Sequence, residues 1–346
     1  MSESDVTAVI VNYRSGDDLD GCIGGLLQDR AHLARVVVID NASGDTSWEP
    51  AARHATEDHR VELIRSQVNL GLAGAVNLVL PTIETPYLAV LNPDATPTLH
   101  WLAPLLEHLM ANPDHAVACP LVLIESTGKV NSAGQHVHVT GLGFNRFLHR
   151  DPAEVPAQPH LVGGLHGAAF LIRTELLRTL RGWDDTGFLY HEDVGLSWDT
   201  LLLGKGIVCV PASRVVHDYR LSMYPEKLFL LERNRIALLL THLPRGRLVA
   251  ISPALLLTEV MVWILALLRG PGFLRAKWRS YREVWNRRSA IAARRAQVRQ
   301  RPVYDIGNLR RFTRWTYPID QLGILGTERG SSTREPPGGL PIDHTA

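Results

Sequence analysis

The 346-residue sequence is 45% hydrophobic and 21% charged, which is typical of a globular protein with one large domain or two smaller ones. Its formal net charge of +1 argues against a nucleic-acid partner, because such proteins carry a marked positive balance. Cys22, Cys119 and Cys209 are odd in number and far apart, so they predict neither a disulfide framework nor a zinc site. The N-terminal residues lack a secretory signal pattern, and we expect a cytoplasmic protein.

The first third of the chain alternates between strand and helix patterns. Runs of β-branched residues at 6–13 and 34–43 flank a helical pattern at 15–30, and a strand at 60–66, a helix at 71–83 and a strand at 86–94 follow. This alternation predicts an α/β fold with a Rossmann-like, mostly parallel sheet. Such sheets bind ligands beyond the carboxyl ends of their strands, where Asn12, Asp40, Asn41 and Asp94 fall.

The next part of the chain is less regular. A helix is predicted at 98–114 and a strand at 116–124, and apolar runs return at 165–180 and 206–217. Residues 128–160 are rich in Gly, His and Pro, so we expect loops or short antiparallel strands that face the site. From residue 326 onward the sequence is polar and rich in Pro and Gly, which predicts a disordered tail over 326–346.

Common nucleotide-binding motifs are absent from the sequence: it has neither a G-x-G-x-x-G after the first strand nor a phosphate-binding loop with G-K-[ST]. It contains instead eight stretches in a fixed order, namely VIVNYRSGDDL, VVVIDNASGD, NLGLAGAVN, LNPDA, GAAFLIR, GFLYHEDVGLSW, VPASRVVH and RNR. This ordered set resembles family 2 of the glycosyltransferases, with the GT-A fold, and in particular its rhamnosyltransferase-like members. The resemblance extends from residue 6 to about residue 236.

The resemblance implies a division of the chain. Residues 1–240 would form the GT-A domain, in which 6–120 bind a nucleotide diphosphate sugar and 121–240 form a smaller acceptor-side, catalytic part. Asn12, Tyr13 and Asp40 would hold the base and ribose, with Asn69, Gly71 and Asn77 nearby. Taken alone, Asp40 could equally be a helix cap or turn residue, Gly71 could serve helix packing, and Asn77 could be a satisfied buried amide.

Asn92-Pro93-Asp94 stands where the family has its Asp-x-Asp metal motif. The resemblance implies that Asp94 and His217 bind a divalent cation, Mn²⁺ or Mg²⁺, which neutralises the charge that develops on a leaving diphosphate. Asn92 replaces one carboxylate and would contact the substrate. By itself the tripeptide reads as a turn, and a single histidine at a strand end is more often structural. Arg220 and Ser222 are further candidates for diphosphate contacts.

Catalysis is assigned, by the same resemblance, to YHEDVGLSW at 190–198. Asp193 would be the base that takes a proton from the acceptor hydroxyl, and a single base opposite a leaving diphosphate implies inversion. Glu192 would support acceptor contacts, although an acidic residue at a helix N-terminus is favourable without any function. Gly195 and Asp199 depart from the family pattern, which has an acid and an arginine there.

Five further residues complete the predicted site. Gly167 and Ala168 would leave room for the sugar, or serve tight packing only. His191 and Trp183 are candidate acceptor contacts, and Trp183 could equally belong to the core. Arg233 could face phosphate or lie on a solvated helix face.

Residues 248–268 form an apolar stretch with Glu259 as its only charge. Pro253 predicts a helix start that leaves too few residues for a simple crossing, and the following residues 269–301 contain eleven Lys or Arg with Glu283 as the only acid. We expect residues 241–325 to form helices that lie in the cytoplasmic face of a membrane. The alternative is a buried helix of a soluble domain.

The sequence thus predicts an inverting, metal-dependent glycosyltransferase. It would move a sugar, with dTDP-rhamnose as the donor that the resemblance favours, to a cell-envelope glycan or a lipid-linked acceptor at the cytoplasmic membrane surface. A second hypothesis is a catalytically silent protein that binds sugar nucleotides or acts as a scaffold at the membrane. Asn92 and Gly195, which stand where the family usually has acids, motivate this alternative.

Overall fold

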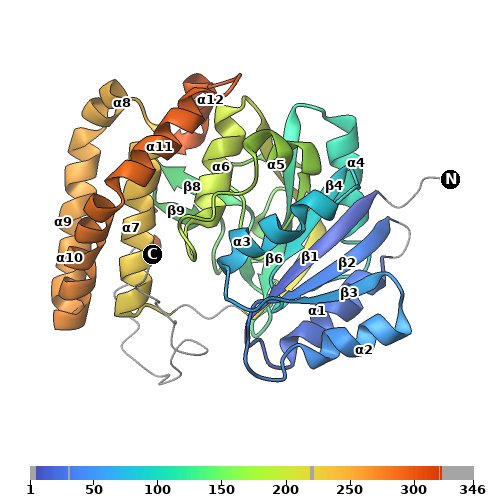
Figure 1. Ribbon diagram of the computed structural model, residues 1–346. Coiled ribbons are helices and arrows are strands. Elements are labelled where there is room, and N and C mark those ends of the chain that lie inside the picture. The colour runs from blue at the N-terminus through green and yellow to red at the C-terminus, as the bar shows by residue number, and fades with distance from the viewer. Residues whose placement is uncertain (1–4, 30–31, 219–221, 319, 322–346) are drawn as a thin grey trace.

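A central sheet organises the chain, which the computed structural model describes over residues 5–29, 32–218, 222–318 and 320–321. The N-terminal strands are all parallel and follow the order β4-β1-β2-β3 (Figure 1). Their buried, β-branched sequences fit a sheet that is covered on both faces. The bounds are β1 (Val6–Asn12), β2 (Leu33–Asp40), β3 (Val61–Arg65) and β4 (Tyr87–Leu91).

The sheet continues beyond β4 as a mixed one, in the order β4-β11-β6-β12-β10. β11 runs antiparallel to both of its neighbours, whereas β12 runs parallel to β6. β11 is reversed because the chain re-enters the sheet at its carboxyl edge, with Ala169 opposite Leu91 at the end of β4. These strands are β6 (His115–Ile124), β10 (His160–Leu161), β11 (Ala169–Arg173) and β12 (Gly206–His217), with β5 (Ala95–Pro97) on β12 and β7 (Val130–Ser132) on β6.

Helices cover both faces of the sheet. Along β1, Ala8 and Ile10 pack into one hydrophobic cluster, and Val9 and Val11 into the other, as the alternation of side chains along a strand requires. The first cluster includes α1 (Asp18–Leu27), α2 (Glu49–Glu57) and α4 (Leu102–Ala111). The second includes α3 (Gly71–Val79), the short helix η1 (Leu80–Thr82), α5 (Thr174–Leu180) and α6 (Glu192–Leu202).

Residues 128–160 contribute short strands, as their composition predicts. A second, three-stranded sheet has the order β13-β8-β9. Its strands are β8 (Gln135–His138), β9 (Gly143–Asn145) and, from the end of the described chain, β13 (Thr313–Arg314); the 3₁₀ helix η2 (Pro152–Glu154) follows β9.

Among the described residues, the helices α7 to α12 stand on the side of the molecule away from β3 (Figure 1). They are α7 (Pro225–His242), α8 (Arg245–Ala250), α9 (Ser252–Arg269), α10 (Pro271–Asn286), α11 (Arg288–Arg299) and α12 (Ile306–Phe312). Pro253 lies in the first turn of α9, which confirms the predicted helix start. The predicted disordered tail, 326–346, lies outside the described residues.

A buried ionic cluster ties α7, α9 and α10 together. Arg235 bonds Glu232 at 2.7 Å and Glu259 at 2.6 Å, and Lys277 bonds Glu259 at 2.7 Å and also Glu232. Glu259, the only charge of the apolar stretch, therefore faces the protein interior. The outward face of α9 is left apolar, with Leu256, Leu257, Val260, Ile264, Leu267 and Leu268 all exposed.

Candidate active site

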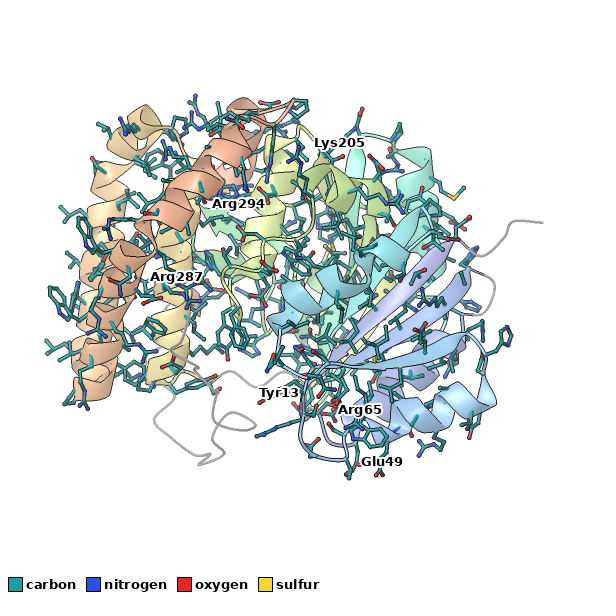
Figure 2. All side chains as sticks on the ribbon, in the orientation of Figure 1. Tyr13, Glu49, Arg65, Lys205, Arg287 and Arg294 are labelled. Carbon is teal, nitrogen blue, oxygen red and sulfur yellow. The ribbon has the colours of Figure 1, made fainter. Side chains whose placement is uncertain are left out.

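A cavity of about 930 Å³ lies at the carboxyl edge of the sheet and extends between α6, α7 and α9. Tyr13 and Arg65, which follow β1 and end β3, mark this edge in Figure 2. Ten of the residues predicted for the site line the cavity. They are Tyr13, Asn69, Gly71, Asn92, Gly167, Ala168, His191, Glu192, Asp193 and His217.

Asn12 and Asp40 tie two strand ends together beside the cavity. Asn12 is fully buried, and its amide donates to Asp40 Oδ1 at 3.1 Å and to the hydroxyls of Ser43 and Ser47. Asp40 is 1% exposed. Neither residue belongs to the cavity wall in the described structure, so both support the loop that presents Tyr13.

Asn77 and Trp183 form a second support outside the wall. The Asn77 amide donates to the backbone oxygen of Trp183 at 2.7 Å and accepts from its N–H at 2.8 Å. The Trp183 indole is buried and donates to the backbone oxygen of Glu192 at 3.1 Å. Through these bonds α3 is linked to the start of α6.

Gly71 sits where only glycine fits. Its φ is +70°, and a Cβ atom would lie 2.0 Å from the backbone oxygen of Phe188, well inside van der Waals contact. The Asn41 amide donates to Asn69 Oδ1 at 2.8 Å and to the Gly71 backbone oxygen at 3.2 Å. The end of β2 thus fixes the 69–71 loop against the segment that precedes α6.

The strand register places Asp94 beside His217. β5 begins directly after Asp94 and pairs antiparallel with the end of β12, with Ala95 opposite His217. Asp94 Oδ1 lies 3.3 Å from His217 Nε2, and His217 Nδ1 lies 2.9 Å from Asn131 Oδ1. The contact with Asn131 orients the imidazole ring so that its other nitrogen, Nε2, lies on the side of Asp94.

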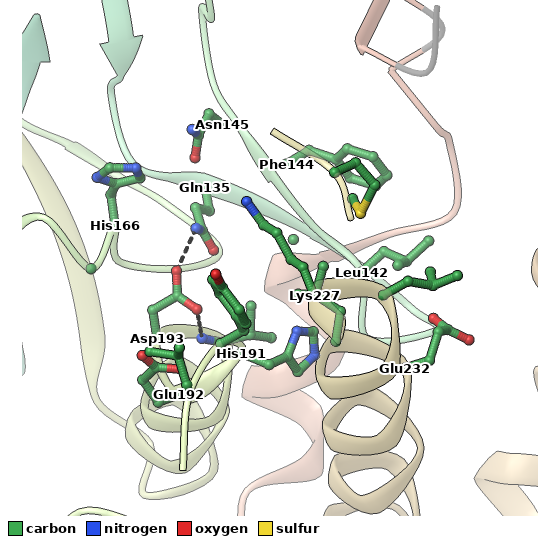
Figure 3. A pocket seen from close by; sticks show the side chains of 18 of the residues that line it. Gln135, Leu142, Phe144, Asn145, His166, His191, Glu192, Asp193, Lys227 and Glu232 are labelled. Carbon is green, nitrogen blue, oxygen red and sulfur yellow. Dashed lines mark hydrogen bonds between the residues drawn. The ribbon is translucent and has the colours of Figure 1, made fainter. Parts of the chain in front are cut away.

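Asp193 and Glu192 open α6 at the centre of the cavity (Figure 3). Asp193 accepts from Gln135 Nε2 at 2.8 Å and from the Val194 N–H at 2.8 Å. Burial raises the pKa of Asp193 despite these bonds. Burial and the neighbouring Asp193 charge raise the pKa of Glu192 to about 8. Glu192 is thus shifted toward proton exchange near neutral pH, and the pKa of Asp193 is shifted in the same direction.

A strained segment leads into α6. Phe188, Tyr190 and His191 all have positive φ, between 63° and 74°, a region that non-glycine residues rarely adopt. The Asn234 amide on α7 donates to the backbone oxygens of Gly187, Leu189 and Tyr190 at 2.8–3.1 Å. Arg233 bonds the same Gly187 oxygen and Asn234 Oδ1, so its side chain holds this segment and does not line the cavity.

Several polar atoms at the site are buried without a hydrogen-bond partner among the described residues. They are Asp94 Oδ1, Asn131 Nδ2, Gln135 Oε1, His191 Nε2 and Glu192 Oε2. Because buried polar groups are normally satisfied, these five atoms make the cavity a candidate binding site for a ligand with hydrogen-bonding groups.

Sequence reasoning did not single out Gln135, Asn131, His166 or Asn234. The first two lie in the irregular 128–160 region, whose periodicity gives no side-chain direction. His166 lines the cavity, and its ring is 5.9 Å from that of His217. It directly precedes Gly167 and Ala168, which the sequence predicts to be near the sugar. Asn234 is the central residue of the RNR element. Of the two further diphosphate candidates, Arg220 lies outside the described residues.

The family model described as glycosyl transferase family 2 matches residues 7–181, about half of the chain. The chain belongs to glycosyl transferase family 2. The predicted family is confirmed, and the rhamnosyltransferase-like subtype stays a prediction. Over 223 residues, which are 64% of this chain and 44% of the relative, it is 27% identical to a pre-mycofactocin glycosyltransferase of Mycobacterium tuberculosis. A putative polypeptide N-acetylgalactosaminyltransferase 9 of Drosophila melanogaster is 29% identical over 54% of this chain and 31% of that relative. This family 2 chain thus spans less than half the length of these two relatives.

Solved structures confirm the GT-A fold of this family 2 chain. GalNAc-T7 with UDP, GalNAc and Mn²⁺ aligns with a TM-score of 0.57 and 19% identity, over 68% of this chain and 47% of that one. The mannosyltransferase PcManGT from Pyrobaculum calidifontis, with GDP-Man and Mn²⁺, aligns with a TM-score of 0.51 and 16% identity, over 86% and 87%. At these identities the likeness concerns the fold. The expected α/β fold is confirmed, but the sheet is mixed beyond β4, where the sequence predicted a mostly parallel one.

Proposed function

We propose that this chain is an inverting, metal-dependent glycosyltransferase that uses a nucleotide diphosphate sugar. The observation that carries the proposal is that Asp193 and His217 line one cavity, while Asp94 lies 3.3 Å from His217. Tyr13, Asn69, Gly71 and Asn92 supply the nucleotide end of this cavity. Both solved neighbours carry a nucleotide or nucleotide sugar and Mn²⁺ in their crystals, which supports the same ligand class here.

Asp193 serves as the base in this proposal. An acceptor hydroxyl is a weak nucleophile, and a carboxylate within hydrogen-bond reach takes its proton as the oxygen attacks the anomeric carbon. The bond from that carbon to the diphosphate breaks on the opposite side, and the configuration inverts. Gln135 and the Val194 N–H orient the carboxylate, and Glu192 supports the acceptor.

Asp94 and His217 fit a divalent cation. Asp94 offers a buried carboxylate oxygen without a hydrogen-bond partner, and His217 Nε2 lies 3.3 Å from it. Carboxylate oxygen and imidazole nitrogen are both ligands that Mn²⁺ accepts. The cation supplies neutralisation of the diphosphate charge as the leaving group departs. Asp94 and His217 would be the two protein residues that hold the cation, since the described residues contain no group of three or more acidic, His or Cys side chains placed for a metal ion.

The finer assignments follow the sequence resemblance. A nucleotide-linked rhamnose is the first donor to test, with a cell-envelope glycan or lipid-linked molecule as acceptor.

The C-terminal helices bear on where the protein lies. With 18 residues, α9 is the one described helix that is long and apolar enough to cross a membrane, whereas the position of Pro253 predicted a helix too short for a crossing; 11% of it is buried. On α10, Arg275, Trp278, Arg282 and Trp285 recur every three or four residues and are exposed, a stripe suited to lipid headgroups. The apolar face of α9 and this stripe support our proposal that the protein lies on the cytoplasmic membrane face.

The test is turnover of candidate donors by the full chain with Mn²⁺. In Asp193→Asn, transfer and donor hydrolysis should fall about 100-fold or more, because positioned bases contribute about 10²–10⁴ in rate. The control is Asp151→Asn, which removes an exposed carboxylate outside the cavity wall. Its turnover should match that of the wild type. Unchanged turnover in Asp193→Asn removes Asp193 as the base. A wild type that turns over no donor and gains no Mn²⁺-dependent thermal stability from nucleotide favours the silent sugar-nucleotide-binding alternative.

A further inference from the structure

The cavity changes from polar to apolar along its length. Its nucleotide end is lined by Tyr13, Asn41 and Asn69, whereas its far end is walled by α7 and α9 with Leu228, Leu231, Met261 and Leu265. A diphosphate and a sugar gain nothing from an apolar wall, because their polar groups need hydrogen bonds. The apolar end therefore fits a molecule other than the sugar donor.

The apolar end is continuous with the outer surface of the protein. Ile264 and Leu268 belong to the cavity wall, and they are also 51% and 80% exposed. The same side chains thus form the wall and the outward apolar face of α9. Glu259 pairs with Arg235 and Lys277 and does not line the cavity. None of the α9 residues in the cavity wall is charged; they are Thr258, Met261, Val262, Ile264, Leu265 and Leu268.

A cation lies between the apolar end and the carboxylates. Lys227 of α7 lines the cavity, and its Nζ is 5.1 Å from the centre of the Tyr190 ring. Its amine points toward the end of the cavity where Gln135 and Asp193 lie (Figure 3). An anionic group joined to a hydrocarbon chain would meet opposite charge here while its chain stays against Leu228 and Leu265.

We propose that the acceptor is an anionic amphiphile whose hydrocarbon chain binds between α7 and α9. Its charged group lies by Lys227, and the hydroxyl to be glycosylated lies at Asp193. The inference rests on the proposed function for the hydroxyl at Asp193, whereas the chain site itself stands on the cavity alone. Association of the outer face of α9 with a membrane would not require a binding site for a hydrocarbon chain inside the cavity.

The test uses two probes, farnesyl phosphate and dodecyl phosphate, each with a photoreactive diazirine at the chain end and each used below its micelle concentration. We expect saturable labelling of α7 and α9 in the full-length protein, competed by the unlabelled lipid phosphate and not by inorganic phosphate. Leu265→Trp fills the apolar end and should weaken binding at least about tenfold, since each methylene excluded from an apolar site is worth about fourfold. Leu267→Trp, on the outer face of the same helix, is the matched control and should bind within about twofold of the wild type.

Labelling restricted to the outer face of α9, or equal affinity of Leu265→Trp and wild type with unchanged melting temperatures, overturns the proposal. Binding of either probe between α7 and α9 supports the proposal. Tighter binding of farnesyl phosphate indicates a branched chain, and tighter binding of dodecyl phosphate indicates a straight one. Donor hydrolysis by wild type and Asp193→Asn is measured on the same preparations. Saturable chain binding without Asp193-dependent hydrolysis contradicts the proposed function alone, and Asp193-dependent hydrolysis without chain binding contradicts this inference alone.

Discussion

Gln135 is the residue that reaches Asp193 from outside its own helix, and its hydrogen bond lowers the pKa of Asp193 against the effect of burial. In Gln135→Leu the carboxyl group loses this bond, so its pKa should rise further. A base works only when deprotonated, so the acidic limb of the kcat/KM profile should move to higher pH. A hydrogen bond to a charged group is worth about 1.5 kcal/mol, which corresponds to a shift of about one pH unit. Activity on the alkaline plateau should persist. A limb that stays in place would show that Gln135 has no influence on the base.

Glu192 should make the stability of the protein depend on pH. Burial, then the Asp193 charge, raises its pKa to about 8 from the usual 4.5, so the folded state holds this proton more tightly than the unfolded chain. The stabilisation is complete below pH 4.5 and is lost as pH rises through 8. Glu192→Gln, which needs no proton, should match the wild type near pH 5 and be more stable by about 1–2 kcal/mol at pH 9, a value reduced for the partial exposure of the site. Denaturant titrations at both pH values measure this, and identical pH dependence of the two proteins would contradict it.

Single residues also show how far sequence reasoning reaches. Asp193 and His217 were found because an ordered set of motifs singled them out, and both line the cavity. Asn12, Asp40 and Asn77 come from the same motifs, yet their side chains bond other groups of the protein and lie outside the cavity wall. A motif marks where polar residues gather, but hydrogen-bond partners far apart along the chain decide which of them face a ligand.

At the scale of elements, the RNR stretch on α7 acts on the strained entry to α6. Asn234→Ala removes three bonds to backbone oxygens, and we expect a loss of about 2–3 kcal/mol in the free energy of unfolding. We also expect faster hydrogen exchange over residues 187–191. Transfer should slow as well, because this segment positions Glu192 and Asp193. An exchange rate equal to that of the wild type over this segment would show that the positive-φ conformation holds without the Asn234 bonds.

The order of elements was predictable where strands and helices alternate, because parallel strands in a covered sheet require apolar runs. The reversed direction of β11 and the second sheet were not, since both depend on contacts between residues distant in sequence. Asp199 illustrates the same limit. It departs from the family pattern, which has an arginine there, and it is buried and bonds His242 at 2.8 Å and Arg301 at 2.6 Å. This acid joins α6 to α7 and to the end of α11, and it lies outside the cavity wall.

At the scale of the whole molecule, apolar and basic residues gather on the C-terminal helices. The sheet and α2 lie on the other side (Figure 1). Such a distribution gives the protein one face that can meet an anionic bilayer, with the outward side of α9 against the acyl chains and the α10 stripe at the headgroups. The cavity then opens along the same face, because Ile264 and Leu268 belong to both.

This arrangement predicts charge-dependent binding to vesicles. Reversing Arg275 and Arg282 together to Glu should weaken binding to vesicles with anionic lipid by about tenfold or more, because each basic residue near such a surface contributes about 1 kcal/mol. The control reverses Arg53 and Arg181, exposed residues on α2 and after α5, which gives the same net charge at other places on the molecule. Co-flotation at rising salt measures the affinity, and the wild type should lose binding as salt screens the charges. Equal losses in both double variants would mean that net charge, and not the α10 face, controls membrane binding.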